Sequence, residues 1–209
     1  MASFIDEYIC EGQKSDVQYD VLPFCACSAN VLSFKSDEVE EAWLHQLSEQ
    51  GVAIIMAQEV RKHKKGVSDR FGFHACFAKP AARNCLGCAI YISSDFVFGK
   101  NRSTRKNVKV LKHQITVLEE DPRLLIVAVA APMLSVILVS GHAPHVGNDA
   151  RSWWDNLSCM ISRHRKGRPV IMGIDTNSTF AGEVDGHIGS CFCNKVIHPH
   201  QQYMNSDVH

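Results

Sequence analysis

The feature that most constrains the fold is a set of short apolar runs that each stop at a polar side chain. Residues 52–58 (VAIIMAQ) are almost wholly apolar and are followed by Glu59, and residues 170–174 (VIMGI) are followed by Asp175. Runs of this length are too short for typical helices and indicate strands buried on both faces. A buried strand is held rigidly while the side chain at its end emerges at the rim. Each carboxylate is therefore a candidate ligand-binding group, although one alone could equally be a surface acid.

The rest of the chain alternates between short β-like runs and two amphipathic helices. The helices are expected at residues 38–50, capped by Ser36 or Asp37, and at residues 149–164. Val39 and Trp43 should face the core from the first helix, and Trp153 and Trp154 from the second. Further strands are expected at residues 21–33, 71–77, 88–93, 108–118, 124–130 and 134–140. This order predicts an α/β (α+β) layered sandwich of two mainly antiparallel β-sheets packed together, with the helices outside.

The length of 209 residues fits one domain with a substantial core. We expect residues 1–20 to be an N-terminal extension and residues 21–209 to form the domain. The longest apolar run, residues 124–139, is broken by Pro132 and Ser135 and is too short to span a membrane. The N-terminus is acidic and lacks the basic region of a secretion signal. We therefore expect an intracellular protein of the cytoplasm or nucleus, without a membrane partner. No sequence feature indicates an oligomeric state.

The nine cysteines are expected to be free thiols, because the chain shows no secretion signal. Cys85 and Cys88 have the spacing of half a zinc site, but no second pair with zinc spacing follows them. We interpret the cysteines as small buried residues.

Charge is unevenly distributed along the chain. The net charge is zero, yet residues 1–50 carry two basic and ten acidic side chains, and residues 51–209 carry the remaining twenty basic and twelve acidic ones. Basic residues cluster at 61–65, 100–112 and 163–168. Such clusters are usually solvated loops, but they could also form a rim that faces phosphates.

Four segments carry polar residues at predicted strand ends. In chain order they are CSANVLSF with Asn30, IIMAQEV with Glu59, ILVSGHAPH with His142 and His145, and VIMGIDTNS with Asp175 and Asn177. This set resembles the endonuclease/exonuclease/phosphatase superfamily (DNase I-like), and within it the endonuclease domain of non-LTR retrotransposons. The resemblance spans about residues 21–189 and includes a central hairpin, HQITVLEEDPRLLIVAVAAP.

The resemblance implies a metal-dependent phosphodiesterase. Glu59 would hold a divalent cation, Mg²⁺ or Mn²⁺, with Asn30 beside it, because such ions take carboxylate oxygens, water and a substrate phosphate as ligands. The cation would polarise the scissile phosphate and stabilise the leaving oxygen.

The resemblance also implies the catalytic and phosphate-binding groups. Asp175 and Asn177 would orient the attacking water and the phosphoryl oxygens, and His142 would donate to a phosphate oxygen. His145, Asn30 and Asn177 would contact the substrate phosphate. DNA would be the substrate.

Three features depart from the family's pattern. One extra residue, Ile174, lies between Gly173 and Asp175, and Leu32 stands where some members place a further acidic ligand. The family also ends in a Ser-Asp-His segment many tens of residues beyond Asp-x-Asn, whereas residues 178–209 alone follow Asn177 here. The closing NSDVH echoes that segment but has an inserted Val and lies too close to Asn177. We expect the domain to be incomplete at its C-terminus, and the chain to be weak or inactive.

Three functions remain open on this sequence. The first is a DNA endonuclease of retroelement type. The second is a phosphatase of the same fold that acts on a phospholipid or an inositol phosphate. The third is a catalytically silent remnant that serves as a binding module.

Overall fold

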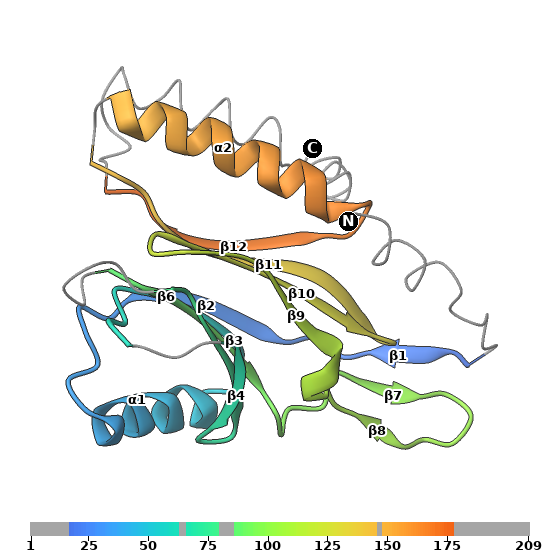
Figure 1. The fold of residues 1–209 in the computed structure, drawn as a ribbon. Coiled ribbons are helices and arrows are strands. Elements are labelled where there is room, and N and C mark those ends of the chain that lie inside the picture. Colours follow the sequence, from blue (N-terminus) through green and yellow to red (C-terminus); the bar gives the residue numbers. More distant parts are fainter. Residues whose placement is uncertain (1–16, 63–65, 80–85, 146–147, 178–209) are drawn as a thin grey trace, which may run out of the picture.

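Two β-sheets stacked face to face, each covered by one helix on its outer side, form most of the protein (Figure 1). The computed structural model describes residues 17–62, 66–79, 86–145 and 148–177. The predicted layered sandwich is confirmed. Neither described helix combines the length and apolar character that crossing a membrane requires.

The first sheet has five strands in the order β2–β3–β6–β5–β4. They are β2 (Cys25–Asn30), β3 (Val52–Gln58), β6 (Cys88–Ser93), β5 (Phe73–Phe77) and β4 (Val67–Arg70). Strands β2 and β3 are parallel, and the other pairs are antiparallel. Helix α1 (Asp37–Glu49) covers the outer face of this sheet (Figure 1).

The second sheet has four strands in the order β12–β11–β10–β9. They are β12 (Val170–Asp175), β11 (Leu134–His142), β10 (Leu124–Ala131) and β9 (Ile115–Asp121). Strands β11 and β12 are parallel, and the other two pairs are antiparallel. Helix α2 (Asn148–Arg165) lies across the outer face (Figure 1).

A small third sheet was not predicted. It joins β1 (Tyr19–Val21), β7 (Gly99–Asn101) and β8 (Asn107–Val108). The strand expected at residues 21–33 is split into β1 and β2, with Pro23, which has no N–H to donate, between them. The strand expected at 108–118 is likewise split, because the 3₁₀ helix η2 (Lys112–Gln114) separates β8 from β9.

The core has three parts, one between the sheets and one beneath each helix. Trp153 and Trp154 pack partly buried against the second sheet, as the periodicity of α2 predicts. The Ser36 hydroxyl caps α1 by accepting a hydrogen bond from Val39 N–H. The predicted burial of Val39 is wrong, since the residue is 50% exposed. The buried face of α1 instead includes the carboxylate of Glu40 beside Leu44.

Candidate active site

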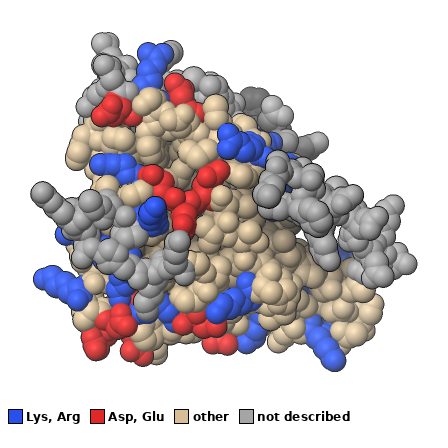
Figure 2. All heavy atoms as spheres, in the orientation of Figure 1, with Lys and Arg blue, Asp and Glu red and all other residues tan. Residues whose placement is uncertain are grey.

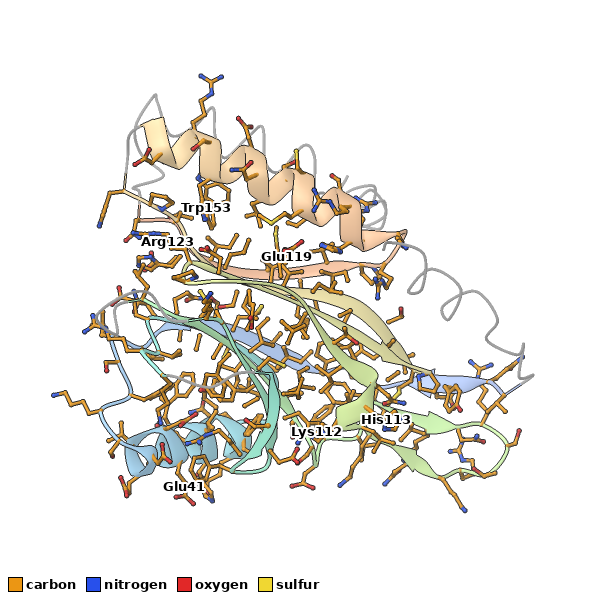
Figure 3. The ribbon with its side chains drawn as sticks, in the orientation of Figure 1. Glu41, Lys112, His113, Glu119, Arg123 and Trp153 are labelled. Carbon is orange, nitrogen blue, oxygen red and sulfur yellow. The ribbon has the colours of Figure 1, made fainter. Side chains whose placement is uncertain are left out.

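Four strand ends meet at one end of the sandwich. Parallel strands end together, so β2 and β3 deliver Asn30 and Glu59 from the first sheet, where Asn30 pairs with Gln58. Strands β11 and β12 deliver His142 and Asp175, which are register partners, from the second sheet. Arg123, labelled in Figure 3 near the start of α2, marks this end of the molecule. The sandwich thus brings together side chains that lie up to 145 residues apart in sequence.

The Asn30 amide bridges the two carboxylates. Its Nδ2 donates to Asp175 Oδ2 at 2.6 Å and to Glu59 Oε1 at 3.2 Å. Its Oδ1 accepts the backbone N–H of Leu32 at 3.0 Å, and this bond fixes which end of the amide faces the carboxylates. Asn30 therefore acts as a donor that holds Glu59 and Asp175 close together.

The His142 imidazole is fixed in one tautomer by Arg123. Arg123 Nη1 lies 2.9 Å from His142 Nδ1. A guanidinium can only donate, so Nδ1 accepts and the neutral ring carries its proton on Nε2. His142 Nε2 lies 3.2 Å from Glu59 Oε1 and 3.9 Å from Asp175 Oδ2. The buried ring thus presents an N–H to the carboxylate pair.

Asn177 closes the site beside His142. Its Nδ2 donates to the Ala143 carbonyl at 2.6 Å and lies 3.2 Å from His142 Nε2. Its backbone N–H donates to Asp175 Oδ1 at 3.1 Å, in a tight turn where Asn177 has a φ of 50°. Asn tolerates this left-handed conformation better than most residues. The Asp-x-Asn spacing thereby gives Asp175 a fixed orientation.

Glu59 lies in an unusual backbone segment. Both Glu59 and Arg61 are left-handed, with φ values of 55° and 53°. Arg61 Nη2 donates to Glu59 Oε2 at 2.8 Å. Burial alone would raise the pKa of Glu59, but the hydrogen bonds from Arg61 and Asn30 and the nearby positive charge outweigh it and lower the pKa below its ordinary value. Glu59 is therefore ionised at neutral pH.

The donor set fits a hard divalent cation. Glu59, His142 and Asp175 each offer one atom, and the three atoms lie within 4.8 Å of one another. Mg²⁺ and Mn²⁺ prefer oxygen ligands, so one or two carboxylates suit them, and water fills the remaining coordination positions of the ion. Since Nε2 of His142 carries a proton in the tautomer that Arg123 imposes, the two carboxylates are the groups suited to hold the ion.

Most of the predicted site residues converge in this cluster. It contains Asn30, Glu59, His142, Asp175 and Asn177. His145 is exposed, and among the described residues no hydrogen bond joins it to the cluster. The closing NSDVH lies outside the described residues, so its role stays a prediction.

Two arginines of the site were missed at the sequence level. The sequence indicates Arg61 only as part of the basic cluster at 61–65, and no motif points to Arg123. The signal for Arg123 is its place directly after the Asp121-Pro122 turn, which puts it at the start of the hairpin strand that pairs with β11. Cys88 is fully buried, and burial raises the pKa of its thiol to about 12. The prediction that the cysteines are buried is wrong for Cys25 and Cys159, which are exposed.

Comparison with known proteins adds a fold assignment. No protein-family model matches the chain, and no curated protein matches its sequence. Among solved structures, the chain is similar to the endonuclease domain of TRAS1, a telomere-specific non-LTR retrotransposon. The TM-score is 0.57, with 14% identity, over 83% of this chain and 71% of that one.

Two bacterial endonuclease/exonuclease/phosphatase family proteins are also similar. The protein from Leptotrichia buccalis has a TM-score of 0.54 and 11% identity, over 83% of this chain and 73% of that one. The protein from Bacteroides thetaiotaomicron has a TM-score of 0.51 and 10% identity, over 84% of this chain and 69% of that one. At these identities the similarity establishes the architecture: the chain has the DNase I-like fold of the endonuclease/exonuclease/phosphatase proteins.

Proposed function

We propose that the chain is a metal-dependent phosphodiesterase that hydrolyses DNA, an endonuclease of retroelement type. The observation that carries this proposal is the convergence of Glu59, His142 and Asp175 within 4.8 Å at the strand ends. A cluster of two carboxylates and an N–H donor is suited to phosphate chemistry, because it combines a cation site with a hydrogen-bond donor for an anion.

Glu59 and Asp175 would hold Mg²⁺ or Mn²⁺, with Asn30 beside them. When bound, the ion supplies Lewis-acid polarisation of the phosphate and stabilises the leaving oxygen. Asn30 keeps the carboxylates together by donating to both of them. This bridge lowers the cost of placing two like charges side by side before an ion arrives.

His142, Asp175 and Asn177 act on the substrate. The Nε2–H group of His142 donates to a phosphoryl oxygen, because Nδ1, the other ring nitrogen, accepts a hydrogen bond from Arg123. Asp175 accepts a hydrogen bond from the attacking water, and Asn177 orients the phosphoryl oxygens. A bond forms between the water oxygen and phosphorus, and the proton that the water loses passes to Asp175. The bond from phosphorus to the leaving oxygen breaks, and that oxygen keeps the electron pair and takes a proton from the solvent. His145, which is exposed three residues beyond His142, would contact a flanking phosphate.

Local cations favour a phosphodiester substrate more than the surface as a whole does. Figure 2 shows Lys and Arg side chains spread among acidic ones, and over the described residues of that face they form no continuous basic patch. Arg61 and Arg123, in contrast, lie directly at the site. The choice of DNA rests on the basic excess after residue 50 and on the fold shared with the TRAS1 endonuclease domain.

Nicking of supercoiled plasmid tests the proposal. The purified chain is incubated with Mg²⁺ or with EDTA, next to Asp175→Ala and a control, Asp95→Ala, whose exposed carboxylate pairs with Lys109 away from the site. We expect slow nicking that needs Mg²⁺, persists in the control and disappears in Asp175→Ala. Phosphate release from an inositol phosphate, without nicking, would favour the phosphatase function. Inactivity of the folded chain on both substrates would favour a silent binding module.

A further inference from the structure

A layer of hydrogen bonds lies directly beneath the candidate active site, between the two sheets. Its members are Ser28 of β2, Gln58 of β3, Ser140 of β11 and Gly173 of β12. Side chains of a strand alternate between faces, so residues two apart point the same way. Ser28, Ser140 and Gly173 each precede a site residue by two positions, and these site residues are Asn30, His142 and Asp175. Gln58 directly precedes Glu59.

The Gln58 amide joins all four strands. Its Nε2 lies 3.0 Å from the Gly173 carbonyl oxygen and 3.1 Å from Ser140 Oγ, both in the opposite sheet. Within its own sheet it lies 3.2 Å from Ser28 Oγ, whose hydroxyl also reaches Gln58 Oε1 at 3.4 Å. Gln58 and Ser140 are buried, with 1% and 0% of their surface exposed. The layer opens to solvent only at Ser28.

The orientation of this amide is dictated by its partners. The Gly173 carbonyl can only accept. Ser140 Oγ uses its hydrogen on the Ala57 carbonyl at 2.9 Å, so it too needs a donor. Both partners in the opposite sheet therefore require an N–H, and the amide supplies two. Neither a carboxylate nor an apolar side chain at position 58 could satisfy them.

The sheets also approach closely at this layer. A Cβ atom on Gly173 would lie 2.5 Å from Ser28 Oγ and 2.8 Å from Met56 Cβ. Glycine is therefore needed here for the sheets to come within hydrogen-bonding distance of Gln58. The layer thus sets both the separation and the relative register of the four strand ends.

We infer that Gln58 is a positioning residue, which holds Glu59 and Asn30 of one sheet at the correct distance from Asp175 and His142 of the other. This inference rests on the proposed function, because it concerns the geometry of the metal site. Without the Gln58 bonds, the sheets stay together through the apolar core between them. The two carboxylates would then be linked across the sheets by the Asn30 amide, without the buried hydrogen bonds that fix the distance between the strands beneath them.

The test compares Gln58→Met with a core variant that should also lower the stability of the fold. Met matches Gln in size but makes no strong hydrogen bond. The control is Val129→Ala, in the buried part of β10 that pairs with Ile115 and Val136, away from the site. Mn²⁺ affinity is measured by electron paramagnetic resonance, and the melting temperature and the nicking rate are measured on the same preparations. Ser140→Ala, which removes one acceptor of the Gln58 amide, serves as a second variant should Gln58→Met not fold.

We expect Gln58→Met, or Ser140→Ala in its place, to weaken Mn²⁺ binding about 10-fold or more and to lower kcat more than it raises KM, as the loss of a supporting residue does at metal sites. Val129→Ala should lower the melting temperature but leave Mn²⁺ affinity unchanged. Unchanged Mn²⁺ affinity and kcat in both layer variants, alongside a fall in melting temperature, would overturn the positioning role and leave the proposed function standing. Failure of the unaltered chain to bind Mn²⁺ would overturn the proposed function itself.

Discussion

Replacing Glu40 by Gln tests how α1 is attached to the first sheet. Glu40 is fully buried, and its carboxylate accepts hydrogen bonds from Arg70 Nη2 at 2.6 Å, Lys62 Nζ at 2.5 Å and Tyr91 Oη at 2.8 Å. Lys62 Nζ also lies 2.6 Å from Asp37 Oδ1, and Arg70 Nη2 lies 2.9 Å from it, but Asp37 is largely exposed. Glu40 is therefore the buried counter-charge for both cations.

The expected loss follows from leaving these cations without that partner. Removing one member of a buried ion pair costs about 3–5 kcal/mol. Gln retains the shape and one acceptor oxygen, and Asp37 still neutralises part of the charge, so we expect the low end, about 3 kcal/mol. For a domain of this size, 1 kcal/mol shifts the melting temperature by about 2–4 °C. The predicted decrease is therefore about 6–12 °C.

Thermal unfolding followed by circular dichroism measures this decrease. The matched control is Glu41→Gln, since Glu41 is the next residue on α1 and is exposed, as its position in Figure 3 shows. It should melt within about 1 °C of the unaltered chain. Equal melting temperatures for Glu40→Gln and Glu41→Gln would refute the reasoning, because Glu40 would then not be a required counter-charge.

Three further outcomes are expected. Burial raises the pKa of the Cys88 thiol to about 12, so a thiol reagent applied to the folded chain should label exposed Cys159 but not Cys88, as peptide mass spectrometry would show. The lowered pKa of Glu59 makes its carboxylate stabilising above its ordinary value of 4.5, and this contribution is lost as the pH falls through the lowered pKa. Urea unfolding should therefore show the stability of the unaltered chain falling, relative to Glu59→Gln, as the pH is lowered from neutral through 4.5. Arg123→Gln should release His142 from its Nε2–H tautomer, which ¹⁵N spectra of the imidazole would detect, and an unchanged tautomer would contradict the assigned contact.

The sequence predicts the strand-end residues well because local pattern determines them. Residues 52–58 form a strand buried along its whole length, and the carboxylate of Glu59 emerges at its end as expected. Asp175, at the end of β12, is placed by the same reasoning. Convergence of these ends follows only once the parallel pairing of β2 with β3 and of β11 with β12 is known.

The parts that were missed depend on long-range contacts. Gln58 is one polar residue in an apolar run, and its partners lie up to 115 residues away. Glu40 looks like an exposed helix residue until Arg70, 30 residues later, is placed beneath it. The apolar pattern predicts Val39 on the buried face, because the sequence does not reveal that Arg70 and Lys62 pair with Glu40 there. The third sheet could not be predicted, because β8 has only two residues, too few to produce a periodic pattern.

The rate of plasmid nicking as a function of Mg²⁺ concentration, for the unaltered chain and for Glu59→Ala, tests the central claim most directly. If Glu59 holds the cation, the unaltered chain should show a saturable dependence on Mg²⁺. The Mg²⁺-dependent nicking rate of Glu59→Ala should be lower than that of the unaltered chain by a factor of about 100 or more, since the ion supplies several kcal/mol of stabilisation to the transition state. Unchanged Mg²⁺-dependent nicking by Glu59→Ala would contradict the account, because hydrolysis would then not depend on the site where the four strands end.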